Sequence, residues 1–169
     1  MKFNIRDLNE KKLIAKSNTE SDAIYAKPST RNGRTLAEVR QSSLYGLAAE
    51  QFLIEKCGFN DDPREFKDVF SPSGVSIEVK VTSAKNVGRK LSECDIEHQK
   101  PWRNFSDWLF IFESVWASGI YNLRGTYHWD GSGFADKAFP WKSEANTAIS
   151  MHEDELWLAN PVWAVKHNA

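Results

Sequence analysis

Three charged side chains near the middle of the chain have the types and spacing of a metal-dependent hydrolase. Glu78 and Lys80 alternate with apolar residues over positions 75–82, and period-two geometry places both on one face of a strand. Asp68 precedes a Ser-Pro-Ser-Gly turn at 71–74 and lies on the other arm of the expected hairpin. Two carboxylates are the usual protein contribution to a Mg²⁺ that binds phosphate, and a nearby ammonium can orient or help to deprotonate the attacking water. The pattern predicts metal-assisted phosphodiester hydrolysis.

A further carboxylate, Glu50, falls within the apolar stripe of a strongly predicted helix over residues 36–57. Thr35 and Glu38 form a capping box at the start of this helix, and Gly58 follows its end. A buried carboxylate is costly without a partner. Glu50 therefore either approaches the expected site or lies at the solvent edge of the stripe.

The acidic-x-Lys triplet at 78–80 is a weak signal by itself, because the chain contains two more, at 10–12 and 65–67. The triplet at 78–80 differs from them in lying on an apolar-alternating strand with an aspartate upstream. The alternative interpretation is an exposed hairpin whose charged residues are ordinary solvated neighbours.

Glu50, Asp68 and the sequence Glu78-Val79-Lys80 resemble the motif of the PD-(D/E)XK, or restriction-endonuclease-like, nuclease superfamily. The separation of Asp68 from Glu78 is similar to that in several compact restriction enzymes, although a lysine replaces the nominal proline before Asp68. The resemblance covers about residues 36–115. It implies an α/β fold with a restriction-endonuclease-like mixed β-sheet core flanked by helices.

The resemblance also implies roles for these residues. Asp68, Glu78 and the backbone carbonyl of Val79 would bind Mg²⁺, for which Mn²⁺ would substitute. Lys80 would act on the attacking water, and Glu50 would assist through a second metal ion or a bound water. The implied enzyme is a homodimeric endonuclease of the type II restriction kind, which cuts double-stranded DNA and leaves 5′-phosphate and 3′-hydroxyl ends. The open alternatives are a structure-specific or phage or mobile-element DNA nuclease of the same fold, and a non-catalytic DNA-binding module that retains the fold.

The net charge of −1 conceals an uneven distribution. Basic residues exceed acidic ones in 1–40 and 81–105, which flank the acidic block that carries the expected site. Phosphate contacts are expected from these flanks. For one candidate, His98, a helix-capping or surface role is the stronger alternative. The candidates are Arg31, Arg34, Arg40, Lys85, Arg89, Lys90, His98, Lys100 and Arg103.

The length of 169 residues suits one domain over 1–169. The sequence has no apolar run long enough for a membrane helix and no secretory signal, and its two cysteines fit a reducing compartment, so a cytoplasmic protein is expected. The seven tryptophans all follow residue 100, which favours a packed sheet core over an aromatic binding platform.

The other elements expected along the chain complete a mixed α/β domain. Residues 1–34 form an N-terminal basic segment that is a long loop from residue 17 onward, and residues 116–169 form a β-rich aromatic extension. The other expected elements are strands at 66–70, 107–116, 120–127 and 162–165, helices at 89–100 and 153–158, and a turn at 130–133.

Overall fold

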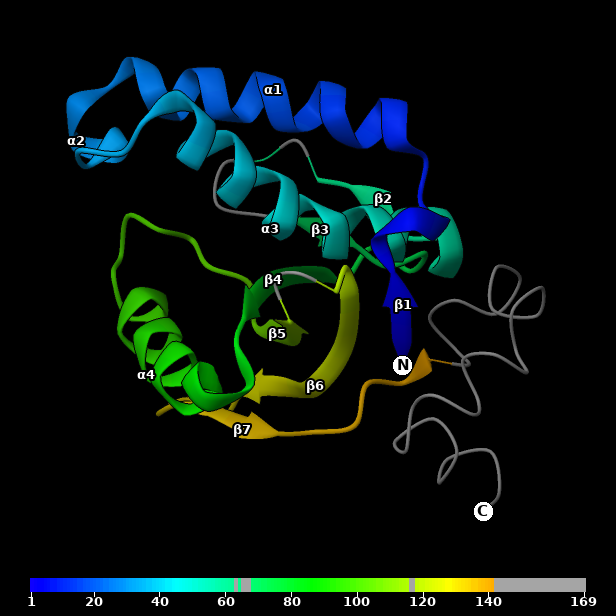
Figure 1. Cartoon of the computed structure of the whole chain (residues 1–169). Coiled ribbons are helices and arrows are strands. Elements are labelled where there is room, and N and C mark those ends of the chain that lie inside the picture. Colours follow the sequence, from blue (N-terminus) through cyan, green and yellow to red (C-terminus); the bar gives the residue numbers. More distant parts are fainter. Residues whose placement is uncertain (63, 65–67, 116–117, 142–169) are drawn as a thin grey trace.

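A curled, mixed β-sheet lies at the centre of the protein, with helices on both of its faces (Figure 1). The structure, a computed structural model, describes residues 1–62, 64, 68–115 and 118–141. The sheet strands of this part run in the order β1 (Lys2–Asn4), β6 (Ile120–Trp129), β5 (Trp108–Val115), β4 (Ser76–Thr82), β3 (Val69–Phe70) and β2 (Asn60–Asp61). A further strand, β7 (Phe134–Asp136), also pairs with β6.

Strands β4 and β5 form the parallel pair of the sheet, and the other described pairs are antiparallel. A helix, α4 (Val87–His98), connects the parallel pair, as parallel strands require. It is preceded by a short 3-10 turn, η2 (Ala84–Asn86). The expected helix at 89–100 and strand at 107–116 are therefore present, with the helix shifted by two residues at each end.

Helix α3 (Leu36–Cys57) covers one face of the sheet, and its predicted capping box is present. Thr35 Oγ1 accepts a hydrogen bond from the Glu38 amide at 3.2 Å, and the Glu38 carboxylate accepts one from the Thr35 amide at 2.7 Å. Gly58 ends the helix in the left-handed conformation, with φ of 71°. The buried side of α3 packs with the inner side chains of β4, β5 and β6 in the main hydrophobic core.

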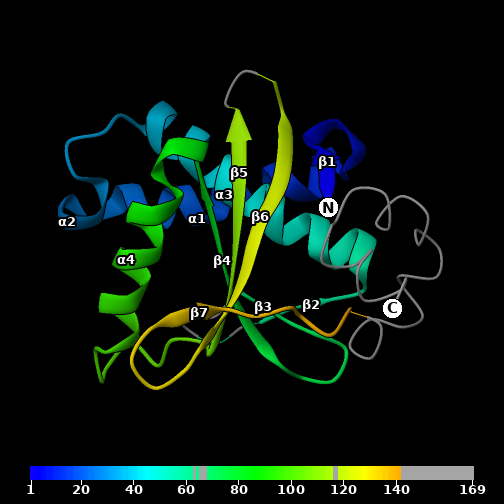
Figure 2. The ribbon, with the colours of Figure 1, turned by 90° about the horizontal axis from the view of Figure 1, so that it is seen from below.

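Helix α4 covers the opposite face of the sheet, where a smaller core includes Cys94, Leu109 and Ile111. Figure 2, which views the molecule from below, shows α4 beside β4 and β5. Because helices cover both faces, Ile77, Glu78 and Val79 are buried in succession. The alternative interpretation, in which Glu78 lies on an exposed face of the hairpin, is therefore wrong.

The long loop expected over residues 17–34 is also wrong, because most of this segment is helical. Helix α1 (Glu10–Ala26) lies along the outer side of α3, and α2 (Pro28–Arg31) follows it (Figure 1). The face of α1 that packs against α3 contains small polar residues: Ser17 and Ser21 are buried, one and two turns after Leu13. Ser17 Oγ donates to the carbonyl of Arg40 at 3.3 Å. An apolar stripe is therefore weak here although the helix is packed.

Two further differences concern the sheet. Strand β1 and the short 3-10 turn η1 (Ile5–Asp7) were not expected, and β1 pairs with β6 through Phe3 and Tyr121. The expected strand at 66–70 is present as β3 at its last two residues, whereas 65–67 lie outside the described residues. The helix expected at 153–158, the strand expected at 162–165 and most of the β-rich extension also lie outside them.

Most of the aromatic residues in the described ranges pack in the core, as expected. Trp141, Phe110, Phe112 and Phe139 are fully buried, whereas Trp102 is exposed. No helix in the described ranges combines the length and apolarity needed to cross a membrane.

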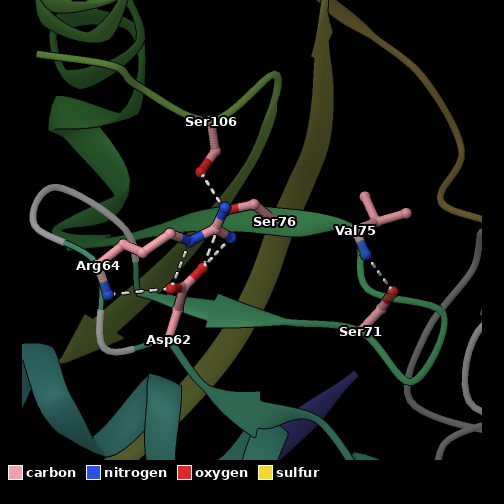
Figure 3. A network of polar contacts seen from close by, with 6 residues as sticks. All are labelled: Asp62, Arg64, Ser71, Val75, Ser76 and Ser106. Atoms are coloured by element: carbon pink, nitrogen blue, oxygen red, sulfur yellow. Dashed lines mark hydrogen bonds and ion pairs between the residues drawn. The ribbon is translucent and has the colours of Figure 1, made fainter.

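A polar network fixes the chain between β2 and β3 (Figure 3). Buried Asp62 accepts hydrogen bonds from Arg64 and from Ser76 Oγ, and Ser76 in turn contacts Ser106 Oγ at 2.8 Å. The Asp62 amide donates to the carbonyl of Asp68 at 3.2 Å. This network therefore ties the backbone of Asp68 to both neighbouring strands.

We predict that Thr35→Ala lowers the free energy of unfolding by about 1 kcal/mol, because it leaves the Glu38 amide at the start of α3 without its capping acceptor. Urea unfolding followed by circular dichroism measures this change. Thr19→Ala is the matched control: Thr19 is an exposed residue inside α1, and alanine has the higher helix propensity there. Equal losses in the two variants would contradict the capping explanation.

Candidate active site

The predicted site lies where β3 separates from β4. The two strands pair at Val69 with Ile77 and at Phe70 with Ser76, and Asp68 directly precedes this pairing. One carboxylate oxygen of Asp68, Oδ2, accepts a hydrogen bond from the Val79 amide at 2.7 Å. Because the N–H and C=O of a strand residue point to the same side, the Val79 carbonyl also faces this edge. The Val79 carbonyl, which the resemblance implied as a further ligand, thus faces the same edge of β4 as Asp68.

Glu78 and Lys80 lie together on the face of β4 that α4 covers. Lys80 Nζ is 2.7 Å from Glu78 Oε1, and the Glu78 side chain is 5% exposed. Burial acts to lower the pKa of Lys80, but the carboxylates of Glu78 and Asp68 outweigh it and raise that pKa above its ordinary value. Lys80 is therefore an ammonium at neutral pH, a cation and hydrogen-bond donor rather than a proton acceptor.

Two cavities meet at Asp68 and Lys80, which line both of them. The first, of about 720 Å³, lies between the edge of β4 and the helices α1 and α3, and Glu20 and Glu50 line it. The second, of about 480 Å³, lies between β4 and α4, and Glu78 lines it. Both volumes are in the range of ligand-binding clefts. The site is therefore accessible from both sides of the strand edge.

Glu50 approaches the site from α3, so the alternative that it lies at the solvent edge of the apolar stripe is wrong. Its side chain is 13% exposed, and its Oε2 is 3.7 Å from Lys16 Nζ on α1. Burial and the negative charge of Asp68 raise the pKa of Glu50 well above its usual range. Burial raises the pKa of Asp68 as well, although Lys80 and the bond from Val79 oppose the rise. The first cavity thus holds crowded carboxylates in a poorly solvated place.

The basic residues predicted to contact DNA are only partly gathered around these cavities. Arg34 lines the first cavity, and Lys90 and Arg103 line the second. Lys90 is 2.9 Å from Glu93, and Arg103 Nε is 2.9 Å from Glu97. The other candidates line neither of these two cavities: Arg31, Arg40, Lys85, Arg89, His98 and Lys100.

The position of His98 favours a structural role. Its ring stacks on Trp129 with centroids 3.9 Å apart, and its Nε2 is 2.9 Å from Asp107 Oδ1. These contacts join the end of α4 to the start of β5 and the end of β6. Such a histidine is not available to a phosphate without breaking them.

The donor set is compatible with Mg²⁺. Among the residues that the structure describes, no three Asp, Glu, His or Cys side chains converge as a ready ion-binding group. Mg²⁺ does not require such a cage, because it keeps several waters and commonly takes one or two carboxylates plus phosphate oxygens. Asp68, Glu78 and the Val79 carbonyl supply oxygen ligands of that kind, and the excess of buried carboxylates favours a cation.

Sequence reasoning missed two residues of the site, Lys16 and Glu20. Both lie on α1, one turn apart, and Glu20 lines the first cavity. Partial burial and the charge of Asp68 raise the pKa of Glu20, although the residue keeps an exposed surface. Because residues 17–34 were expected to form a loop, no helix was expected to bring Glu20 to the site. The spacing of Leu13, Ser17 and Ser21 at four-residue intervals was the available sign of a packed helix.

Comparison with known proteins finds no matching family model, no matching curated protein and no matching solved structure.

We predict that Glu50→Gln stabilises the metal-free protein by on the order of 1 kcal/mol near neutral pH. Because the folded-state pKa of Glu50 is raised, its carboxyl opposes folding as the pH rises above the ordinary pKa of the unfolded chain, and the penalty grows until the pH reaches the folded-state pKa. The gain should disappear below about pH 4, where the carboxyl is protonated in both the folded and unfolded states. Urea unfolding in EDTA across this pH range measures the effect.

Glu93→Gln is the control with the opposite sign. The hydrogen bond from Lys90 lowers the pKa of Glu93, so removal of this charge should not stabilise the protein at neutral pH. A loss of stability in Glu50→Gln at every pH would show instead that Lys16 fully compensates the Glu50 charge.

Proposed function

We propose that this protein is a Mg²⁺-dependent endonuclease of the PD-(D/E)XK superfamily that hydrolyses DNA phosphodiester bonds. The observation that carries the proposal is the hydrogen bond between Asp68 and the Val79 amide. It places the aspartate beside the strand that carries Glu78 and Lys80, and the three residues line connected cavities. The sequence alone contained only the separation of these three residues along the chain.

The order of elements around the site supports the same proposal. A long helix carrying Glu50 is followed by the β3–β4 hairpin, then by α4, then by β5, which runs parallel to β4. This is the order that the resemblance implied for residues 36–115. Helices cover both sheet faces, and the acidic residues gather at the one edge where the β3–β4 ladder ends.

Each residue of the site would have a separate role in hydrolysis. Mg²⁺ held by Asp68, Glu78 and the Val79 carbonyl would supply Lewis-acid polarisation of the phosphate and a more acidic water. Lys80, an ammonium, orients the attacking water by hydrogen bonding and offsets charge that develops on the phosphate. Hydrolysis joins the water oxygen to phosphorus and breaks the bond to the 3′ oxygen, which leaves 5′-phosphate and 3′-hydroxyl ends.

Basic groups near the second cavity are suited to the flanking phosphates. Lys90 and Arg103 line this cavity beside Glu78 and Lys80. Their ion pairs with Glu93 and Glu97 involve partly exposed side chains, which water screens, so exchange of these partners for a phosphate is inexpensive. The homodimer and the preference for duplex DNA follow from the resemblance and belong to the same proposal.

We predict that the purified protein cleaves plasmid DNA in Mg²⁺ or Mn²⁺, and that Asp68→Asn and Lys80→Met each lower the rate by on the order of 10²- to 10⁴-fold. Asparagine can still accept the Val79 hydrogen bond, and methionine keeps the length of the lysine stem, so both variants are designed to stay folded. Gel electrophoresis of cleavage products measures the rate. EDTA should abolish cleavage, and replacement of Mg²⁺ by Ca²⁺ should support binding without turnover.

Asp136→Asn and Lys12→Met are the matched controls, because both residues are exposed and line neither cavity. Discrete fragments indicate a restriction-type enzyme, and cleavage confined to branched or single-stranded substrates indicates a structure-specific one. DNA binding without cleavage in either metal on any of these substrates would leave the non-catalytic module and reject the nuclease. Full activity in Asp68→Asn would reject the assignment of the site.

A further inference from the structure

Lys16 lies beside Glu50, one of the carboxylates that line the first cavity. Its Nζ is 2.7 Å from Asp61 Oδ1 and 3.7 Å from Glu50 Oε2. It belongs to α1, which lies outside the part of the chain that resembles a nuclease. The two carboxylates come from different elements, Glu50 from α3 and Asp61 from β2. One ammonium thus serves as a common counter-ion for carboxylates from two elements.

The two lysines of the site act on different sides of Asp68. Lys80 Nζ contacts Glu78 on the side of α4, whereas Lys16 Nζ contacts Glu50 and Asp61 on the side of α1 and α3. Asp68 lies between the two groups and lines both cavities. Each side of Asp68 therefore has carboxylates with one ammonium among them.

A fixed ammonium and a dication compete for the same carboxylates. A Mg²⁺ bound by Glu50 would need its oxygens at about 2.0–2.1 Å and most of its coordination shell satisfied by oxygen. The Lys16 ammonium, already within ion-pair distance of Glu50 and Asp61, would repel such an ion and would lose its own partners to it. On the other side, Lys80 can turn from Glu78 toward a phosphate, because its side chain is 33% exposed at the cavity where the phosphate would enter.

We propose that the Lys16 ammonium takes the place of a second divalent ion, so that the site binds a single divalent ion, through Asp68 and Glu78. This inference rests on the proposed function and specifies the metal requirement of that site. Lys16 is then a positioning residue, which holds the Glu50 carboxyl in place through their contact, and Glu50 is not itself a metal ligand in the unmodified protein.

The experiment counts Mn²⁺ ions bound to the full-length protein without DNA, from the loss of the free Mn²⁺ signal in electron paramagnetic resonance. The expected stoichiometry is one ion per chain in the unmodified protein and two in Lys16→Met. Lys16→Arg, which keeps the charge, should bind one. The double variant Lys16→Met/Glu50→Gln should return to one, because the second ion loses its main ligand. Lys12→Met, an exposed lysine one turn earlier on α1, is the matched control and should bind one.

The outcomes separate this inference from the proposed function. If the unmodified protein binds two ions, or if Lys16→Met has a native circular dichroism spectrum and still binds one, the inference is overturned and the nuclease proposal stands. The ion of the unmodified protein should be lost in Asp68→Asn. If the unmodified protein binds no ion at millimolar Mn²⁺, both the metal site and the inference fail. In cleavage assays, Lys16→Met should change the dependence of the cleavage rate on Mg²⁺ concentration from first order to second order.

Discussion

The hydrogen bond from the Val79 amide to the Asp68 carboxylate determines how the rest of the site is arranged. It gives the amide of Val79, which lies two residues beyond the Val69–Ile77 pair of the described ladder, a hydrogen-bond acceptor. Asp68 lines both cavities from this edge of β4. The Asp62 network holds the Asp68 backbone from the other side, through the amide of Asp62 and the contact between Ser76 and Ser106 (Figure 3).

The second constraint is charge. Carboxylates from two helices and two strand segments meet near one edge, and burial raises the pKa of several of them. Two lysines, Lys16 and Lys80, offset part of this charge from opposite sides. Such an arrangement opposes folding, and packing elsewhere compensates for it, as is common where a fold retains costly groups for binding or catalysis. The large aromatic core under α3 supplies that packing.

Helix α1 joins these two constraints. It reaches α3 closely because Ser17 and Ser21 are small, and this close contact brings Glu20 to the first cavity and Lys16 to Glu50. A helix outside the recognisable motif thus becomes one wall of the site. Strand β1, which precedes α1 in the chain, pairs with β6 in the sheet. Its Phe3 ring stacks with the rings of Phe52 and Tyr121.

Local interactions explain what the sequence by itself determined. The capping box of Thr35 and Glu38, the turn before β4 and the alternation of residues 75–82 each depend on neighbours a few residues apart, so α3, the hairpin and the pairing of Glu78 with Lys80 were predictable. The position of Asp68 could also be predicted, because one tight turn fixes it relative to Glu78. The motif residues of the candidate site and the mixed α/β class could therefore be predicted.

Only the tertiary structure decided the rest. It made α1 a helix with a polar packing face, brought Lys16 to Glu50 from 34 positions away in the sequence, and buried Glu78 under α4. It also paired Lys90 and Arg103 with acidic neighbours and gave His98 a stacking partner. These contacts depend on how close separate elements approach and on which charges share one poorly solvated space, and neither is encoded in the periodicity of any single segment.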